Sequence, residues 1–200
     1  MDDRTLTWYE NNAPDYVKRT RNTDMHYAYQ RFLDDTFQGA EILDFGCGSG
    51  RDTKYFLEKG MQVTACDGSS AIVKEASAYT GIPVSCMKFN ELNADNQYDG
   101  IWACASLLHL QYEDLKDVFG RMLKAIRKEG IIFMSFRYGT FEGYRDERWY
   151  TDLDIEKAAD LILPHRDALL LECWKSHDAE NRDFSWLNLI VRKVTPHDHR

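Results

Sequence analysis

The segment that most constrains this chain is ILDFGCGSG at residues 42–50, in which an apolar run ends in Asp44 and glycines follow at alternate positions. The apolar run predicts a buried strand, and the glycines predict a sharp turn directly after it. Because glycine has no Cβ, such a turn lets a ligand lie against bare backbone. Residues 42–50 therefore predict a buried strand that leads into a ligand-binding turn, and the residues after them predict a helix.

The glycine spacing argues against two common phosphate-binding loops. The dinucleotide fingerprint G-x-G-x-x-G/A needs a small residue at position 51, which is Arg51 in this chain. A Walker loop needs Gly-Lys-Ser/Thr after the glycines, and no such sequence follows them. The turn therefore does not fit an NAD pyrophosphate site, and a nucleoside triphosphate loop is excluded.

Apolar runs alternate with helical patterns along most of the chain, and its 200 residues fit one domain with a sizeable core. We expect strands at 41–45, 61–66, 83–87, 98–104 and 131–136, and helices at 51–59, 70–79 and 112–127. This alternation predicts a parallel sheet with helices on both faces. Two further apolar runs within 164–194 are separated by SHDAENRD and predict an antiparallel hairpin.

The acidic residue followed by G-x-G-x-G resembles motif I of the class I S-adenosylmethionine (SAM)-dependent methyltransferases. The resemblance continues through VTACDGSS, YDGIWACASLLHL and KEGIIFMSF, and it covers about residues 38–137 in order and spacing. It implies an α/β, Rossmann-like, doubly wound and mostly parallel seven-stranded sheet, with an antiparallel last strand and helices on both faces. Residues 1–200 would form a single domain, similar to the tellurite-resistance and ubiquinone-type enzymes that methylate small molecules.

The resemblance also implies a SAM site, with S-adenosylhomocysteine as the product. Asp67 would hold the ribose, because a carboxylate accepts two hydrogen bonds from a vicinal diol. Asp44 would favour the ammonium group of the cofactor. Where many members place an Asp for the adenine, this chain offers Phe89 for packing and Asn90 as an acceptor. The expected cofactor contacts are Asp44, Gly46, Cys47, Gly48, Gly50, Asp67, Gly68, Ser69, Phe89, Asn90 and Ala103.

The chemistry that the resemblance implies needs little from the protein. The methyl group of SAM sits on a positively charged sulfur, so the protein mainly has to align a nucleophile and exclude water, and no metal is expected. A thiolate acceptor needs positioning alone, whereas a hydroxyl or amine acceptor gains about 10²–10⁴-fold from a general base. His109, after the fourth strand, is the candidate base. A histidine packed against the sheet without a catalytic role is the alternative.

Two segments outside the alternating strands and helices suggest where the acceptor binds. Residues 137–152 form a substrate-side loop after the fifth strand, where ligands bind in open parallel sheets. Its arginines fit an anionic acceptor, although surface ion pairs are the alternative. Residues 1–36 are rich in aromatics and predict either a helical cap over the cofactor mouth or a helical edge on the sheet. The candidate substrate contacts are Arg137, Tyr138, Arg145 and Arg148.

Composition narrows the choice of partners. The net charge of −8 disfavours a broad phosphate-binding face, and ACAS at 103–106 lacks the motifs of enzymes that methylate DNA amines or cytosine C5. Five cysteines without a C-x-x-C pair predict reduced thiols. No run of about 18 apolar residues and no signal peptide is found, which favours the cytoplasm and no membrane partner.

The sequence therefore predicts a cytoplasmic methyltransferase, a monomer or homodimer, that acts on a small molecule. Two alternatives stay open. One is a SAM-binding sensor or partner subunit without catalysis, and the other is a tRNA or rRNA methyltransferase.

Overall fold

Seven strands form one sheet in the order β3-β2-β1-β4-β5-β9-β8. The computed structural model describes residues 3–180 and 182–195. Strands β1 to β5 run parallel, while β9 pairs antiparallel with both β5 and β8. This arrangement confirms the predicted doubly wound sheet and its antiparallel last strand. The strands are β1 Glu41–Phe45, β2 Gln62–Asp67, β3 Val84–Cys86, β4 Tyr98–Ala103, β5 Ile126–Arg137, β8 Ala168–His177 and β9 Ser185–Lys193.

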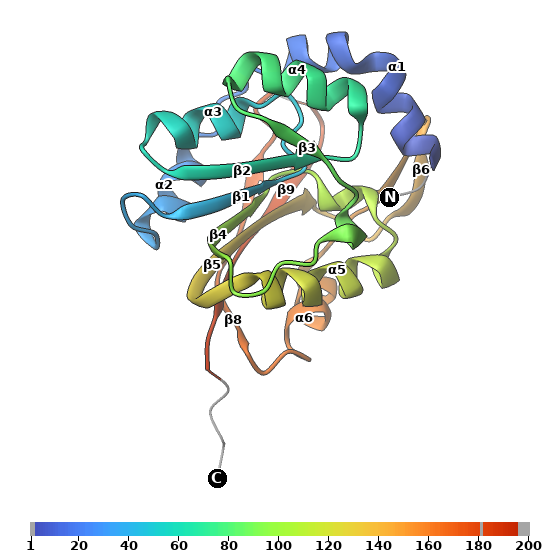
Figure 1. The fold of residues 1–200 in the computed structure, drawn as a ribbon. Helices are drawn as coiled ribbons and strands as arrows, with labels where there is room; N and C mark the ends of the chain where they lie inside the picture. Colours follow the sequence, from blue (N-terminus) through green and yellow to red (C-terminus); the bar gives the residue numbers. More distant parts are fainter. Residues whose placement is uncertain (1–2, 181, 196–200) are drawn as a thin grey trace.

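Helices cover both faces of this sheet (Figure 1). One layer holds α1 Asp3–Thr20, α2 His26–Asp34, α3 Arg51–Glu58 and α4 Ser70–Thr80, and the other holds α5 Tyr112–Ala125 and α6 Ile155–Ile162. Two short 3₁₀ helices, η1 Phe89–Glu91 and η2 Leu107–His109, follow β3 and β4. Among the described residues, no helix is long and apolar enough to cross a bilayer.

Successive side chains of the parallel strands point to opposite faces of the sheet and pack into a hydrophobic core on each face. Leu43 and Phe45 of β1 pack into the cluster that includes α5 and α6, while Ile42 packs into the cluster of α2 and α3. Trp102 of β4 stacks on Phe133 of β5 with ring centroids 4.0 Å apart. Strands buried on both faces read as continuous apolar runs, which is why the sequence located them well.

Three segments differ from the sequence expectation. Residues 137–152 are not an irregular loop, because β6 Glu142–Arg145 and β7 Arg148–Thr151 pair there as a separate antiparallel hairpin. Strand β5 begins directly after α5, so the residues between the expected helix at 112–127 and the expected strand at 131–136 belong to the strand. Helix α6 is an element that the sequence analysis did not assign. Whether short segments such as β6 and β7 form strands depends more on the partner with which they pair than on local propensity.

The N-terminal helices occupy two different places. Helix α1 packs on α4 and reaches the glycine turn after β1, where Tyr16 contacts Gly48 and Leu6 contacts Gly68. Helix α2 instead packs Tyr29 and Phe32 against the aromatic core around α3 and β4. One helix therefore lies over the predicted ligand turn and the other on the sheet face, and the capping role of residues 1–36 stays a prediction.

Candidate functional site: a cavity at the carboxyl edge of the sheet

The glycine turn after β1 is crowded and strained in a way that only glycine accommodates. Gly46, Gly48 and Gly50 adopt φ values of 87°, 53° and 76°. A Cβ on Gly46 would lie 2.5 Å from the Cβ of Ser106, and one on Gly48 would lie 2.8 Å from the hydroxyl oxygen of Tyr16. Left-handed backbone and close approach together explain why three glycines occur at this position. The turn therefore presents bare backbone to its neighbours.

Asp67, at the end of β2, lies beside this turn and holds it in place. One carboxylate oxygen accepts from the Gly48 amide at 3.1 Å, and the other accepts from the Ser69 amide at 3.0 Å. Burial raises the pKa of Asp67 to about 6. Since a carboxylate oxygen can accept two hydrogen bonds, each oxygen retains capacity for a ligand hydroxyl. Ser69 also caps α4, its hydroxyl accepting from the Ile72 amide at 3.3 Å.

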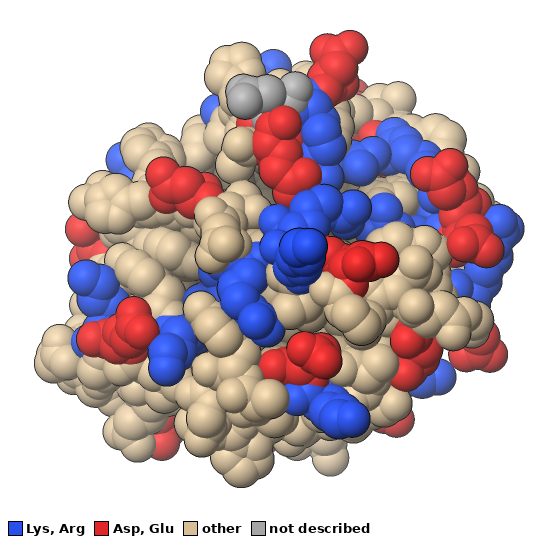
Figure 2. All heavy atoms as spheres, turned by 90° about the horizontal axis from the view of Figure 1, so that it is seen from above, with Lys and Arg blue, Asp and Glu red and all other residues tan. Residues whose placement is uncertain are grey.

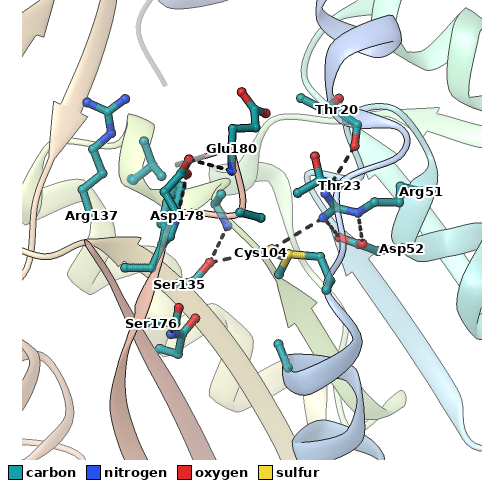
Figure 3. Close-up of a pocket in the computed structure, with 18 of the residues that line it drawn as sticks. Thr20, Thr23, Arg51, Asp52, Cys104, Ser135, Arg137, Ser176, Asp178 and Glu180 are labelled. Atoms are coloured by element: carbon teal, nitrogen blue, oxygen red, sulfur yellow. Dashed lines mark hydrogen bonds and ion pairs between the residues drawn. The ribbon is translucent and has the colours of Figure 1, made fainter. Parts of the chain in front are cut away.

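A cavity of about 310 Å³ opens beside the turn. It is lined by residues from α1, the turn, the ends of β4 and β5, β7 and the β8–β9 connection (Figure 3). Six of the predicted site residues line it: Gly46, Cys47, Gly48, His109, Arg137 and Arg148. The others, Asp44, Gly50, Asp67, Gly68, Ser69, Phe89, Asn90, Ala103, Tyr138 and Arg145, do not line it. The roles expected for all of these residues stay predictions.

Several predicted cofactor residues lie behind the turn. The Asp44 carboxylate is buried and accepts from the Thr53 hydroxyl at 2.5 Å. Phe89 is buried edge-on against Phe45, with ring centroids 4.9 Å apart, whereas Asn90 is exposed. Ala103 is fully buried. None of these four residues lines the cavity, and the sequence pattern alone did not distinguish them from the residues that do.

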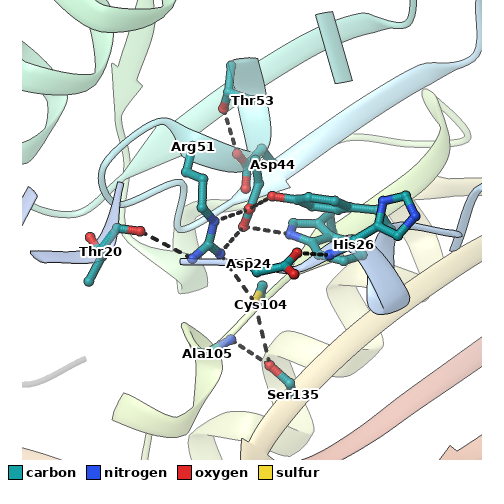
Figure 4. Close-up of polar contacts among 12 residues, drawn as sticks. Thr20, Asp24, His26, Asp44, Arg51, Thr53, Cys104, Ala105 and Ser135 are labelled. Carbon is teal, nitrogen blue, oxygen red and sulfur yellow. Dashed lines mark hydrogen bonds and ion pairs between the residues drawn. The ribbon is translucent and has the colours of Figure 1, made fainter. Parts of the chain in front are cut away.

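A buried polar network centred on Asp52 lies beside the cavity (Figure 4). The Asp52 carboxylate accepts from Arg51 at 2.6 and 2.9 Å, from the Trp102 indole at 2.9 Å, and from the Tyr29 hydroxyl. Burial opposes ionisation, but the Arg51 charge and these hydrogen bonds lower the pKa of Asp52 overall. Arg51 lines the cavity and was missed as a site residue, although its position directly after the glycines was visible in the sequence.

His109 contacts α1 and β7 inside the cavity. Its Nδ1 lies 2.6 Å from the Trp149 carbonyl oxygen, and its Nε2 lies 2.8 Å from the Tyr9 hydroxyl. A carbonyl only accepts, so Nδ1 carries a proton, and in the neutral ring Nε2 accepts from Tyr9. Burial raises the pKa of Tyr9 to about 12, which keeps this hydroxyl protonated. Tyr9 is a second missed residue, because only the tertiary structure brings α1 to His109.

The four predicted substrate residues occupy different environments. Arg137 and Arg148 line the cavity, while Arg145 donates to both carboxylate oxygens of Asp152, at 2.7 and 2.5 Å. Tyr138 is exposed, and its ring stacks under the Lys175 ammonium at 4.1 Å. The structure therefore places Arg137 and Arg148 on the cavity wall with His109, whereas Tyr138 and Arg145 do not line the cavity.

The β8–β9 connection contributes a further wall that the sequence did not predict. Trp174 and Trp186 on these strands are half-buried and line the cavity, although their apolar runs predicted only an antiparallel hairpin. Asp178 also lines it and accepts from Arg182 and from the Trp186 indole at 3.0 Å. The five cysteines are all free thiols, and Cys86 and Cys173 are exposed while Cys47 and Cys66 are buried.

Comparison with known proteins agrees with this fold and turn. The methyltransferase domain family matches residues 42–130. Malonyl-[acyl-carrier protein] O-methyltransferase of Salmonella typhimurium is 28% identical over 131 residues, which is 64% of this chain and 50% of that protein. Phosphoethanolamine N-methyltransferase 3 of Arabidopsis thaliana is 26% identical over 135 residues, 58% of this chain and 27% of that protein. The chain thus spans half or less of the length of these two relatives.

The sheet and its helices also match a solved methyltransferase structure. The 1,6-didemethyltoxoflavin-N1-methyltransferase of Burkholderia thailandensis, crystallised with its acceptor and S-adenosylhomocysteine, superposes with a TM-score of 0.78. It is 21% identical, and the match covers 96% of this chain and 88% of that one. At this identity the likeness concerns the fold. Residues 42–130 therefore match the methyltransferase domain family, within a sheet whose strand order and antiparallel last strand are those of a Rossmann-like methyltransferase fold.

Proposed function

We propose that this protein transfers a methyl group from SAM to a small-molecule acceptor by in-line displacement. One observation carries the proposal: the bare-backbone turn after β1, which is held by the half-buried Asp67 carboxylate, lines a cavity together with His109. The family match to residues 42–130 supports it. So do the small-molecule methyltransferases among the relatives.

The residues around the turn fit the cofactor. When bound, SAM supplies an electrophilic methyl group on a sulfonium. Asp67 would hold the ribose hydroxyls, the backbone of Gly46 and Gly48 would lie against the cofactor, and the Arg51 guanidinium would face its carboxylate. Helix α1 lies over the Asp67 side of this site, since Tyr16 and Leu6 contact Gly48 and Gly68. We infer that α1 shifts when the cofactor enters.

Tyr9 and His109 would remove the proton of a hydroxyl or amine acceptor. Because the Tyr9 hydroxyl donates to His109 Nε2 at 2.8 Å, an acceptor that donates to the Tyr9 oxygen passes its proton along this pair. The acceptor proton would move to Tyr9 as the Tyr9 proton moves to Nε2, which would leave the acceptor with a free lone pair for methyl transfer. The Trp149 carbonyl would stabilise the resulting imidazolium through Nδ1.

Calorimetry with SAM tests the proposal. The unmutated protein should bind SAM with a dissociation constant below a millimolar. The Asp67→Ala variant should bind about tenfold or more weakly, because hydrogen bonds to a charged group contribute about 1.5–3 kcal/mol. Asp114→Ala, an exposed change on α5, is the matched control and should bind normally. Binding weaker than a millimolar, or no loss in Asp67→Ala, would count against the proposal.

An acceptor panel with S-adenosylhomocysteine as the readout separates the alternatives. SAM retention without product from any acceptor would indicate a sensor or partner subunit. Steeply salt-dependent RNA binding would indicate an RNA methyltransferase, because phosphate contacts release counterions. A cytosolic location and a monomeric or dimeric state belong to the same proposal, and cell fractionation and light scattering check them.

A further inference from the structure

Three arginines surround Tyr150 on the cavity wall, and they differ in how their charge is compensated. The guanidinium carbons of Arg137, Arg148 and Arg145 lie 4.5, 5.3 and 5.4 Å from the centre of the Tyr150 ring. Arg145 is neutralised by the bidentate pair with Asp152. Arg137 and Arg148 have no ion pair with any described carboxylate, and the Nε of each is buried without a hydrogen-bond partner.

Aromatic rings hold both uncompensated arginines in position. Arg137 also stacks on Phe184 at 4.2 Å, and Arg148 stacks on Trp8 at 4.0 Å. Stacking engages the flat face of a guanidinium and leaves its N–H edge available, and that edge matches a carboxylate or phosphate. The two side chains are therefore oriented before any ligand arrives.

Two other arginines that line the cavity are charge-compensated. Arg51 pairs with Asp52, and Arg182 pairs with Asp178, so these two charges are balanced within the protein. Burial lowers the pKa of Arg137, and the nearby Arg145 charge lowers it further. A partly buried cation without a counterion is costly, and a bound anion would relieve that cost. Arg137 lies across the cavity from Arg51 and Asp52 (Figure 3).

The local charge also departs from the charge of the whole chain. The net charge is −8, yet lysine and arginine side chains gather in a band on the face drawn in Figure 2, with acidic side chains beside it. Charge sign is therefore distributed unevenly over this face.

We propose that Arg137 and Arg148 bind an oxyanion of the methyl acceptor, so that the acceptor is a small carboxylate or phosphate. This inference rests on the proposed methyl-transfer function. Arg148 Nη1 lies 3.5 Å from the Tyr9 hydroxyl, which in turn contacts His109. An acceptor anchored on the arginines by its anionic group thus places a nearby hydroxyl or amine beside the Tyr9–His109 pair.

Calorimetry on the full chain saturated with S-adenosylhomocysteine tests the inference with four probes that share a phenyl ring. The probes are benzoate, phenyl phosphate, benzyl alcohol and benzylammonium. At least one anion should bind tenfold or more tightly than benzyl alcohol, and benzylammonium should bind most weakly. Tighter binding of benzoate identifies a carboxylate acceptor, and tighter binding of phenyl phosphate identifies a phosphate acceptor.

Variants show whether the two arginines are responsible. Arg137→Gln and Arg148→Gln should each weaken anion binding about tenfold or more and leave benzyl alcohol unchanged. Arg148→Lys should keep part of the anion preference, because it retains the charge without the planar fork. Lys175→Gln is the matched control, since Lys175 also stacks on an aromatic ring but lies outside the cavity. It should bind every probe as the unmutated protein does.

The possible outcomes separate this inference from the proposed function. Failure to bind S-adenosylhomocysteine would overturn the proposed function. Normal cofactor binding with equal affinity for anionic and neutral probes, or with no measurable anion binding, would overturn the inference alone. So would full anion preference in both glutamine variants.

Discussion

At the scale of single residues, the Tyr9–His109 pair carries the acid–base chemistry that the proposal requires. Tyr9→Phe keeps the ring that packs edge-on against Trp8 and Tyr16 but removes the hydroxyl. We expect Tyr9→Phe and His109→Gln each to lower kcat about 10²–10⁴-fold for a hydroxyl or amine acceptor. SAM affinity should change little in either variant. The kcat of the unmutated protein should fall at low pH, where the base is protonated, and this acidic limb should be absent in His109→Gln.

Steady-state kinetics across pH, with calorimetry for the cofactor, check this expectation. A purely structural histidine predicts a different result, namely lower thermal stability with an unchanged pH profile. A thiol acceptor should be methylated almost normally by both variants, because a thiolate needs no base.

At the scale of elements, α1 lies against the turn, and we propose that it controls access to it. The Glu10 carboxylate of α1 accepts from the amides of Ser70 and Ala71, at 2.5 and 3.2 Å, at the start of α4. Loss of a carboxylate that caps a helix costs about 1 kcal/mol. We therefore expect Glu10→Ala to loosen α1 and to speed SAM association several-fold, because α1 must shift for the cofactor to enter.

Stopped-flow fluorescence and hydrogen exchange of α1 amides measure this effect. Glu113→Ala is the control, since Glu113 occupies the first turn of α5 and pairs only with Lys116 among described residues. Unchanged α1 exchange together with an unchanged association rate in Glu10→Ala would show that α1 does not gate the site.

At the scale of the whole molecule, buried carboxylates make stability depend on pH. Burial raises the pKa of Asp67 to about 6, and burial together with the neighbouring Asp52 charge raises the pKa of Asp44. A group whose pKa is raised on folding stabilises the fold below its unfolded value, about 4, and that stability is lost as pH rises through the folded pKa. The contribution of Asp44 and Asp67 to the free energy of unfolding should therefore decline as the pH rises above about 4.

Asp44→Asn isolates one of these contributions, because its side-chain oxygen still accepts from Thr53. Urea denaturation at pH 5 and pH 8 measures the free energy of unfolding of both proteins. Relative to the unmutated protein, the variant should be more stable at pH 8 than at pH 5. The gain should be a few kcal/mol, because the pKa of Asp44 is raised to about 8 and the unmutated protein loses about 1.4 kcal/mol for each pH unit between its unfolded and folded pKa. An equal stability difference at both pH values would contradict the raised pKa of Asp44.

Local sequence determined the parallel part of this fold. The apolar runs of β1, β2 and β4, the glycines after β1 and the amphipathic pattern of α5 each carry their own signal, because burial on two faces and left-handed backbone restrict residue type locally. The order of these elements was enough to predict the sheet and the position of the ligand turn.

Only the tertiary structure decided which side chains meet in the cavity. Tyr9 and His109 are separated by 100 residues, and nothing in either local sequence indicates their contact. Arg145 and Arg148 looked equivalent along the chain, yet Asp152 neutralises only Arg145. Periodic burial is a local property of a sequence, whereas charge compensation depends on which distant segments pack together, and this difference explains what could and could not be predicted.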